Sequence, residues 1–395
     1  MTPAKRRQYG TGSVYQRGSD GRWFGVIDAG YNKNGTRRRI TVSAKTEAEA
    51  KTRLKLKARD LDRGEDTSSR TTVKVWAEKW LVITEKTVRP NTHTADLAAA
   101  RWIIEAIGHK RLDQLTPSDV RSVSVALDKA GRSSSTANRY HGTLQRMLKA
   151  ATAEGLPVPP RVLVVDAPTP AVTDRRAIPT PEALAILHAA STLPHWSRWV
   201  AAFLQGMRGG EANGLLWENV RADHYVVSWQ LQPLPYKVPR DRKSGFRVPN
   251  GYEARQLVGQ MHLVRPKSKA GWRVIPLLPA MSEALEAWRI VAPESPHGLV
   301  WPALDGSPAN EHEDREEFKA LQGAACVGHP AGRYYYPHEA RHGLATMLLE
   351  LGAPEAVRTA IMGHSSIAST AAYEHVDTDE MRRFLEGVAG RLQLG

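Results

Sequence analysis

Two histidines, a glutamate and an arginine stand together in the segment HEARH, at residues 338–342. On a helix, His338 and His342 would lie one turn apart on one face, as zinc ligands do in the His-Glu-x-x-His motif, with Glu339 beside them to deprotonate a metal-bound water. The same letters place His338 and Arg341 on one helical face at a spacing of three. These two patterns imply unrelated chemistries, so the rest of the chain must decide between them.

The charge of the chain favours a polyanionic partner. Its 395 residues hold 55 Lys and Arg against 41 Asp and Glu, a formal net charge of +14. Such an excess points most often to nucleic acid. The only cysteine is Cys326, and no apolar run approaches the length that spans a bilayer. We therefore expect a cytoplasmic protein with no membrane partner, which counts against a secreted zinc protease.

Residues 1–64 predict a small basic module. They contain 16 Lys and Arg against 6 Asp and Glu. Thr46 and Glu49 have the spacing of a capping box and predict a helix from Thr46. Three short strands are expected before it: SVYQ (13–16), RWFGVIDAGY (22–31) and TRRRITVS (36–43). On or near these strands, four arginines are placed to enter a DNA groove: Arg22, Arg37, Arg38 and Arg39.

Two further modules follow. Apolar residues recur at helical spacing through residues 71–160, which predicts a helical domain. Prolines in residues 161–176 indicate an extended linker. The third module, residues 177–395, carries the residues that could perform chemistry.

Within the third module, several polar residues occupy informative positions. Arg208 follows a buried helix and a glycine-rich break, and shares a helical face with Glu211, whose carboxylate could hold the guanidinium. VVSWQLQ (226–232) predicts a strand, and LVRPKSKAGWRVIPL (263–277) predicts a hairpin with Lys267 and Lys269 near its tip. Pro354 and Gly363 predict a helix start and stop. His364 follows that stop, and Tyr373 lies on a short helical stretch after it.

This ordered set closely resembles the signature of the tyrosine recombinase (phage integrase) family. Four segments carry the resemblance: QGMRGGEANGLLWENV, KSKAGWRVIPL, HEARHGLATMLLELG and MGHSSIASTAAYEHV. Residues 1–64 resemble the arm-type DNA-binding domain of lambda-like integrases, and residues 71–160 their helical core-binding domain. The resemblance implies a multidomain α+β fold: a three-stranded sheet with one helix, a helical domain, and a mixed, mainly α catalytic domain with a small antiparallel sheet.

The resemblance also implies a reaction that cuts and rejoins DNA through a covalent 3′-phosphotyrosine and needs no metal or other cofactor. Tyr373 would be the nucleophile, and Arg208 and Arg341 would neutralise charge on the phosphate. Lys267 would protonate the leaving 5′ oxygen. Lys269 would bind DNA, and it is also the alternative general acid because residues 230–260 are longer than in typical members. His338 would exchange a proton with the tyrosine, His364 would bind the phosphate and Glu211 would support Arg208.

By the same resemblance, the substrates are double-stranded attachment sites of core and arm type, where the enzyme integrates or excises a phage or other mobile element. A homotetramer would assemble on the DNA, helped by an excisionase or a host DNA-bending protein. Residues 378–395 have one apolar helical face, predicted to dock on a neighbouring protomer, with docking on its own domain as the alternative. Alternative functions are a type IB topoisomerase and a catalytically silent DNA-binding relative. The zinc pattern leaves Arg208, Arg341 and Tyr373 unexplained.

Overall fold

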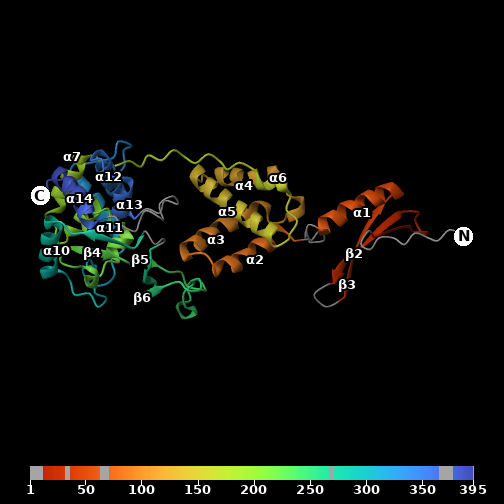
Figure 1. Cartoon of the computed structure of the whole chain (residues 1–395), viewed down its shortest axis with the longest axis horizontal. Coiled ribbons are helices and arrows are strands. Elements are labelled where there is room, and N and C mark those ends of the chain that lie inside the picture. The colour runs from red at the N-terminus through yellow and green to blue at the C-terminus, as the bar shows by residue number, and fades with distance from the viewer. Residues whose placement is uncertain (1–11, 32–35, 63–70, 267–270, 364–376, 395) are drawn as a thin grey trace. The chain divides into compact units, whose positions relative to one another are not determined.

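The computed structural model describes residues 12–31, 36–62, 71–266, 271–363 and 377–394. The chain divides into two compact units, Met1–Val172 and Thr173–Gly395, and Figure 1 labels many of their elements. Among the described residues, no helix combines the length and the apolar character needed to cross a membrane. The fold is mixed α+β, as the sequence predicts.

The first unit begins with the predicted sheet. Strands β1 (Ser13–Gln16), β2 (Trp23–Tyr31) and β3 (Arg37–Ala44) pair antiparallel in the order β1-β2-β3. Helix α1 (Glu47–Asp62) packs on one face, and its first turn is capped by the Thr46 hydroxyl, which accepts from the Glu49 N–H at 3.3 Å. Gly25 permits this close approach, because a Cβ there would lie 3.3 Å from Leu54.

Helices form the rest of this unit: α2 (Val73–Glu85), α3 (Pro90–Ile107), α4 (Pro117–Lys129) and α5 (Ser134–Ala153). They enclose an apolar core in which Trp76 is buried and its indole N–H donates to the Met147 carbonyl at 2.8 Å. The segment that follows is not extended throughout, because Pro160–Leu163 forms one helical turn, α6. Proline is compatible with a first helical turn, and burial of Val162 holds this turn on the helical core.

In its described residues, the second unit holds a large apolar core and two small antiparallel sheets. Every residue of α8 (Ser197–Phe203) is buried, and those from Trp199 to Phe203 belong to that core. Around it lie α7 (Thr180–Ala190), α9 (Gly209–Asn213), α10 (Pro279–Val291), α11 (Glu311–Ala324), α12 (Pro337–Glu350), α13 (Glu355–Met362) and α14 (Thr378–Arg391). The strands are β4 (His224–Val227), β5 (Gln230–Pro233), β6 (Ala254–Val258), β7 (Met261–Val264) and β8 (Arg273–Pro276).

The pairing of these strands differs from the prediction. The expected single strand at 226–232 is broken between Val227 and Gln230, and its halves join different sheets. The expected hairpin at 263–277 is also wrong: β7 lies between β5 and β6, whereas β8 pairs with β4. Periodicity along a strand indicates which residues share a face, but it carries no information about which distant strand supplies the hydrogen bonds.

Helix α14 corrects the prediction about the C-terminal tail. Its apolar face was expected on a neighbouring protomer, but Met381, Leu385 and Val388 are buried in the core of their own unit. The helix contacts β8, α12 and α13. The trans-docking prediction for this face is therefore wrong, because the face is already covered within the chain.

Candidate active site

The site is built around Arg208, the residue that precedes α9. Its backbone N–H and its guanidinium donate to the two oxygens of Glu211, at 3.0 Å and 2.6 Å. Glu211 therefore caps the first turn of α9 and fixes the side chain of Arg208 at the same time. A third bond, from Arg208 to the Gly363 carbonyl at 3.3 Å, ties this turn to the end of α13. Arg208 keeps about a third of its side chain exposed (35%).

Arg273, on β8, completes the cluster, and sequence reasoning missed it. Its guanidinium donates to both oxygens of Glu211, at 3.2 Å and 2.9 Å, and its Nε–H donates to the Ile361 carbonyl at 2.9 Å. The side chain is buried. The available sequence signal was an arginine at the start of an otherwise apolar strand, since a buried cation requires a partner.

Glu211 remains ionised in this cluster. Burial by itself would raise the pKa of the Glu211 carboxyl, but the charge and hydrogen bonds of Arg273, followed by the charge of Arg208, lower it to about 2. One buried carboxylate thus holds two arginines, one of them facing solvent.

Arg341 lies on α12 and is almost fully buried, with 1% of the residue exposed. Its two terminal nitrogens donate to the carbonyls of Gly206 and Met362. The guanidinium therefore joins α12 to the segment before Arg208 and to the end of α13. Gly206 has a positive φ of 59°, and a Cβ there would lie 2.7 Å from Leu344, so the close approach requires glycine.

Positive charge is in surplus at this point. Burial and the nearby charges of Arg208 and Arg273 lower the pKa of Arg341 to about 9, against the opposing charge of Glu211. Arg341 is still protonated at neutral pH, but its charge is incompletely compensated. A bound anion would relieve this repulsion.

His338 lies on α12, close enough to Arg341 and Arg208 for their charges to affect its pKa. Desolvation lowers the pKa of His338 to about 4, and His342, Arg341 and Arg208 act in the same direction. The rings of His338 and His342 meet edge to face, with centroids 4.9 Å apart. At neutral pH the imidazole of His338 is therefore uncharged and able to accept a proton.

We expect His338 to titrate near pH 4 in the free protein and at higher pH when duplex DNA is added, because nearby phosphates favour the cationic form. Histidine ring chemical shifts, assigned with a His338→Gln variant, would measure both midpoints. A midpoint above pH 6 without DNA, or one that DNA leaves unchanged, would contradict this electrostatic account.

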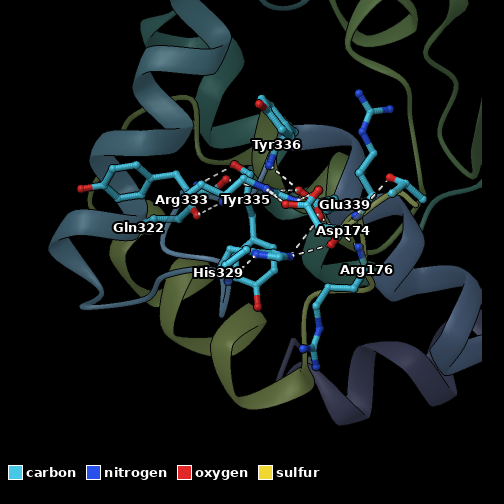
Figure 2. A network of polar contacts seen from close by, with 12 residues as sticks. Asp174, Arg176, Gln322, His329, Arg333, Tyr335, Tyr336 and Glu339 are labelled. Atoms are coloured by element: carbon cyan, nitrogen blue, oxygen red, sulfur yellow. Dashed lines mark hydrogen bonds and ion pairs between the residues drawn. The ribbon is translucent and has the colours of Figure 1, made fainter. Parts of the chain in front are cut away.

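Glu339, the acid of the HEARH segment, has a different role from the one that a zinc site requires. Its buried carboxylate accepts from Arg333 at 2.8 Å and 3.0 Å, from the Tyr336 N–H at 2.8 Å and from the Arg176 N–H at 3.0 Å. Figure 2 shows these groups converging with Asp174, which also binds Arg333. Glu339 therefore holds the start of α12 against the segment before α7, whereas a zinc protease would need it beside a metal-bound water.

The remaining predicted catalytic residues are Lys267, Lys269, His364 and Tyr373, which lie outside the described residues. The chain leads into the last two from Gly363, which ends α13 in the left-handed conformation (φ 62°, ψ 42°) and whose carbonyl accepts from Arg208. The described part of the chain brings together the predicted catalytic residues Arg208, His338 and Arg341 with the predicted supporting residue Glu211.

The arginines predicted to bind DNA lie on the N-terminal sheet. Arg22 and Arg39 are exposed. Arg37 is also exposed and pairs with Asp28 at 2.9 Å, while the side chain of Arg38 is outside the described residues. Opposite the face that α1 covers, Arg17 lies over the ring of Phe24 at 4.5 Å, and Phe24 stacks on Tyr15. Aromatic and basic side chains thus share the open face of the sheet.

Comparison with known proteins matches this chain to integrases and tyrosine recombinases. Residues 177–380 match the model of the phage integrase family. An integrase of Streptomyces ambofaciens is 26% identical over 380 residues, covering 93% of this chain and 92% of that protein. The tyrosine recombinase XerC of Mesorhizobium japonicum is 29% identical over 154 residues, covering 38% of this chain and 48% of XerC.

A similar fold occurs in a solved structure of lambda integrase, described as a tetramer bound to a Holliday junction. The TM-score is 0.55 at 15% identity, with 94% of this chain and 97% of that one covered. The family model spans more than half of the chain, including Arg208, Glu211, His338 and Arg341. The chain belongs to the phage integrase family and is a tyrosine recombinase.

Proposed function

We propose that this recombinase cuts and rejoins double-stranded DNA at specific attachment sites, with Tyr373 as the nucleophile. The observation that carries the proposal is the surplus of fixed positive charge at Arg208 and Arg341, next to the segment that leads to Tyr373. Attack on a phosphodiester places negative charge on the phosphoryl oxygens, and such charge is stabilised by cations already held in place.

The proposed reaction proceeds in two mirrored steps. The Tyr373 oxygen attacks phosphorus and forms a 3′-phosphotyrosine, while the bond from phosphorus to the 5′ oxygen breaks. His338, uncharged at neutral pH, accepts the tyrosine proton, and Lys267 or Lys269 protonates the 5′ oxygen. His364 hydrogen-bonds the phosphate. In the second step a 5′ hydroxyl attacks the phosphotyrosine, so the bond energy is conserved and no ATP is consumed.

Covalent trapping tests this proposal directly. A nicked duplex whose short 5′ fragment diffuses away after cleavage should leave the protein attached to DNA, visible as a shifted band on a denaturing gel. Because arginines supply the charge, we expect the band to form in EDTA. Absence of the band on DNA carrying the attachment site would contradict the proposal. A band lost in EDTA and restored by zinc would instead revive a metal site at HEARH.

We also propose that each of the three modules has its own function. Residues 1–64 bind arm sites, residues 71–160 bind core sites and residues 177–395 perform catalysis. The basic and aromatic open face of the N-terminal sheet supports the first assignment. Two DNA-binding modules on one chain would act as a bivalent ligand that bridges distant sites.

Deletion of residues 1–64 should lower the affinity for long attachment DNA and reduce its salt dependence, because fewer phosphates are neutralised. Cleavage of a short core site should persist. Filter binding at several salt concentrations, with footprinting of both proteins, would measure the effect. An unchanged footprint after the deletion would contradict arm binding by this module.

Four copies of the chain are proposed to act together, because exchange between two duplexes needs four cleavages and each chain carries one Tyr373. An excisionase or a host DNA-bending protein belongs to the same proposal as an accessory factor. Since the apolar face of α14 is covered within its own unit, contacts between protomers must use other surfaces.

A further inference from the structure

Residues 234–260, here called the basic lobe, form an excursion from the three-stranded sheet of the catalytic unit. The lobe leaves β5, includes β6 and returns at β7. Figure 1 shows the segment around β6 projecting from the helical body of the unit. The mechanism described above assigns no role to this lobe.

The lobe has a defined conformation. The rings of Tyr236 and Phe246 stack with centroids 5.1 Å apart, and Phe246 meets His262 edge to face at 4.3 Å. The Lys237 N–H donates to the Gly245 carbonyl at 2.9 Å. The backbone positions that carry the charged side chains of this lobe are therefore set by a folded loop.

Its charge is strongly positive. The lobe contains six Lys and Arg against two Asp and Glu. Glu253 is engaged by Arg265 at 2.8 Å, and Asp241 accepts from the Lys243 N–H at 2.9 Å. Five exposed basic side chains of the lobe have no ion-pair partner among the residues that the structure describes: Lys237, Arg240, Arg242, Lys243 and Arg255.

The backbone of Arg240 adopts a conformation that is unfavourable for residues other than glycine. The Asp241 N–H donates to the Val238 carbonyl at 3.0 Å and closes a turn with Pro239 second and Arg240 third. Arg240 has a φ of 68°, in the left-handed region, where this type of turn prefers glycine. The arginine therefore carries a backbone cost that glycine would not, and backbone strain of this kind is found at functional sites.

The sheet from which the lobe extends packs against α9, the short helix that begins directly after Arg208. A Cβ at Gly214, which follows α9, would lie 2.6 Å from the Leu231 nitrogen on β5, so the two backbones are in direct contact. Strand β7 leads from the lobe toward Lys267, only three residues after the strand ends at Val264. A duplex whose phosphate reaches Arg208 extends away from it in both directions with one charge per ~1.7 Å of axis, so it offers phosphates to basic side chains near this short helix.

We propose that the basic lobe binds the phosphate backbone of the duplex beside the cleavage site, with Arg240, Arg242 and Lys243 as its principal contacts. This inference rests on the proposed function and adds a DNA contact outside the catalytic cluster. Binding is through phosphate charge, and it is therefore independent of base sequence.

The test measures affinity for a fluorescent mixed-sequence duplex of about 30 base pairs, roughly three helical turns, over a range of salt concentrations. The slope of log affinity against log salt is negative, and each lost phosphate contact should reduce its magnitude by ~0.9. We therefore expect the magnitude of this slope to fall by ~0.9 in Arg240→Gly and by ~1.8 in the double variant Arg242→Gln/Lys243→Gln. The first variant relieves the backbone at residue 240, so its Tm should be unchanged or higher, which separates lost binding from unfolding.

The matched control is Arg315→Gln/Lys319→Gln, which removes the same charge from α11, a helix that also carries Glu311, Glu313 and Glu316. Its slope should equal that of the wild type. An unchanged slope in the lobe variants, or an equal loss in the control, would overturn the proposal. So would intact binding combined with loss of protein–protein assembly on native gels, which would identify an acidic surface of another protomer as the partner. Covalent trapping of the wild type, run in parallel, reports on the recombinase function separately.

Discussion

Tyr373→Phe is expected to abolish the covalent protein–DNA complex while duplex binding stays within about twofold of the wild type. The substitution removes only the nucleophilic oxygen, whereas binding depends on phosphate contacts from arginines and lysines elsewhere. Trapping on the nicked duplex, resolved by denaturing gel, measures the amount of covalent complex. Fluorescence anisotropy with the same DNA measures duplex binding.

Tyr334→Phe provides the matched control. Tyr334 is 42% exposed, and losing its hydroxyl should leave both covalent attachment and binding unchanged. A covalent band that survives in Tyr373→Phe would show that another residue is the nucleophile. Loss of binding in that variant would show that Tyr373 acts before the chemical step.

Glu211→Gln is expected to destabilise the catalytic unit by roughly 3–5 kcal/mol, the usual cost of removing one partner from a buried ion pair. Glu211 is 2% exposed and compensates both Arg273 and Arg208. An uncharged amide of the same shape cannot balance either cation. Covalent attachment should also fall by about 100-fold, since Arg208 loses the group that orients it.

The stability difference between wild type and Glu211→Gln should depend on pH in a definite direction. The pKa of Glu211 is about 2 in the folded protein, below its ordinary value of 4.5. Between pH 4.5 and 2 the native state binds fewer protons than the unfolded state, so the stability from Glu211 falls as pH falls through this window. The difference in the free energy of unfolding between wild type and Glu211→Gln should therefore be largest above pH 4.5 and decrease as the pH falls below 4.5.

Denaturant unfolding at several pH values would measure this effect. The control Glu218→Gln changes an exposed acid seven residues later in the sequence and should alter stability by less than about 0.5 kcal/mol. Equal stability of Glu211→Gln and wild type at pH 7 would mean that the two arginines do not depend on this carboxylate.

Local features of the fold could be predicted from the sequence. The capped start of α1, the helices of residues 71–153 and the stop of α13 at Gly363 all follow from short-range rules. Apolar spacing determines which face of a helix is buried, and the left-handed region at Gly363 favours glycine. The motif around Arg208 and the pattern at His338 and Arg341 also pointed to the recombinase family from the letters alone.

Other features were decided only by tertiary structure. Spacing on α14 indicated an apolar face but not the surface that covers it, and strand periodicity did not reveal that β7 and β8 belong to different sheets.

Arg273 shares Glu211 with Arg208 from a strand more than 60 residues away along the chain, and Glu339 meets the N–H of Arg176 across a still longer separation. Such contacts depend on where packing places distant backbones, whereas patterns in the sequence report the preferences of neighbouring residues. The sequence therefore determined most helices, the N-terminal strands and the family, and the packed core determined which strands pair and which charges share one carboxylate.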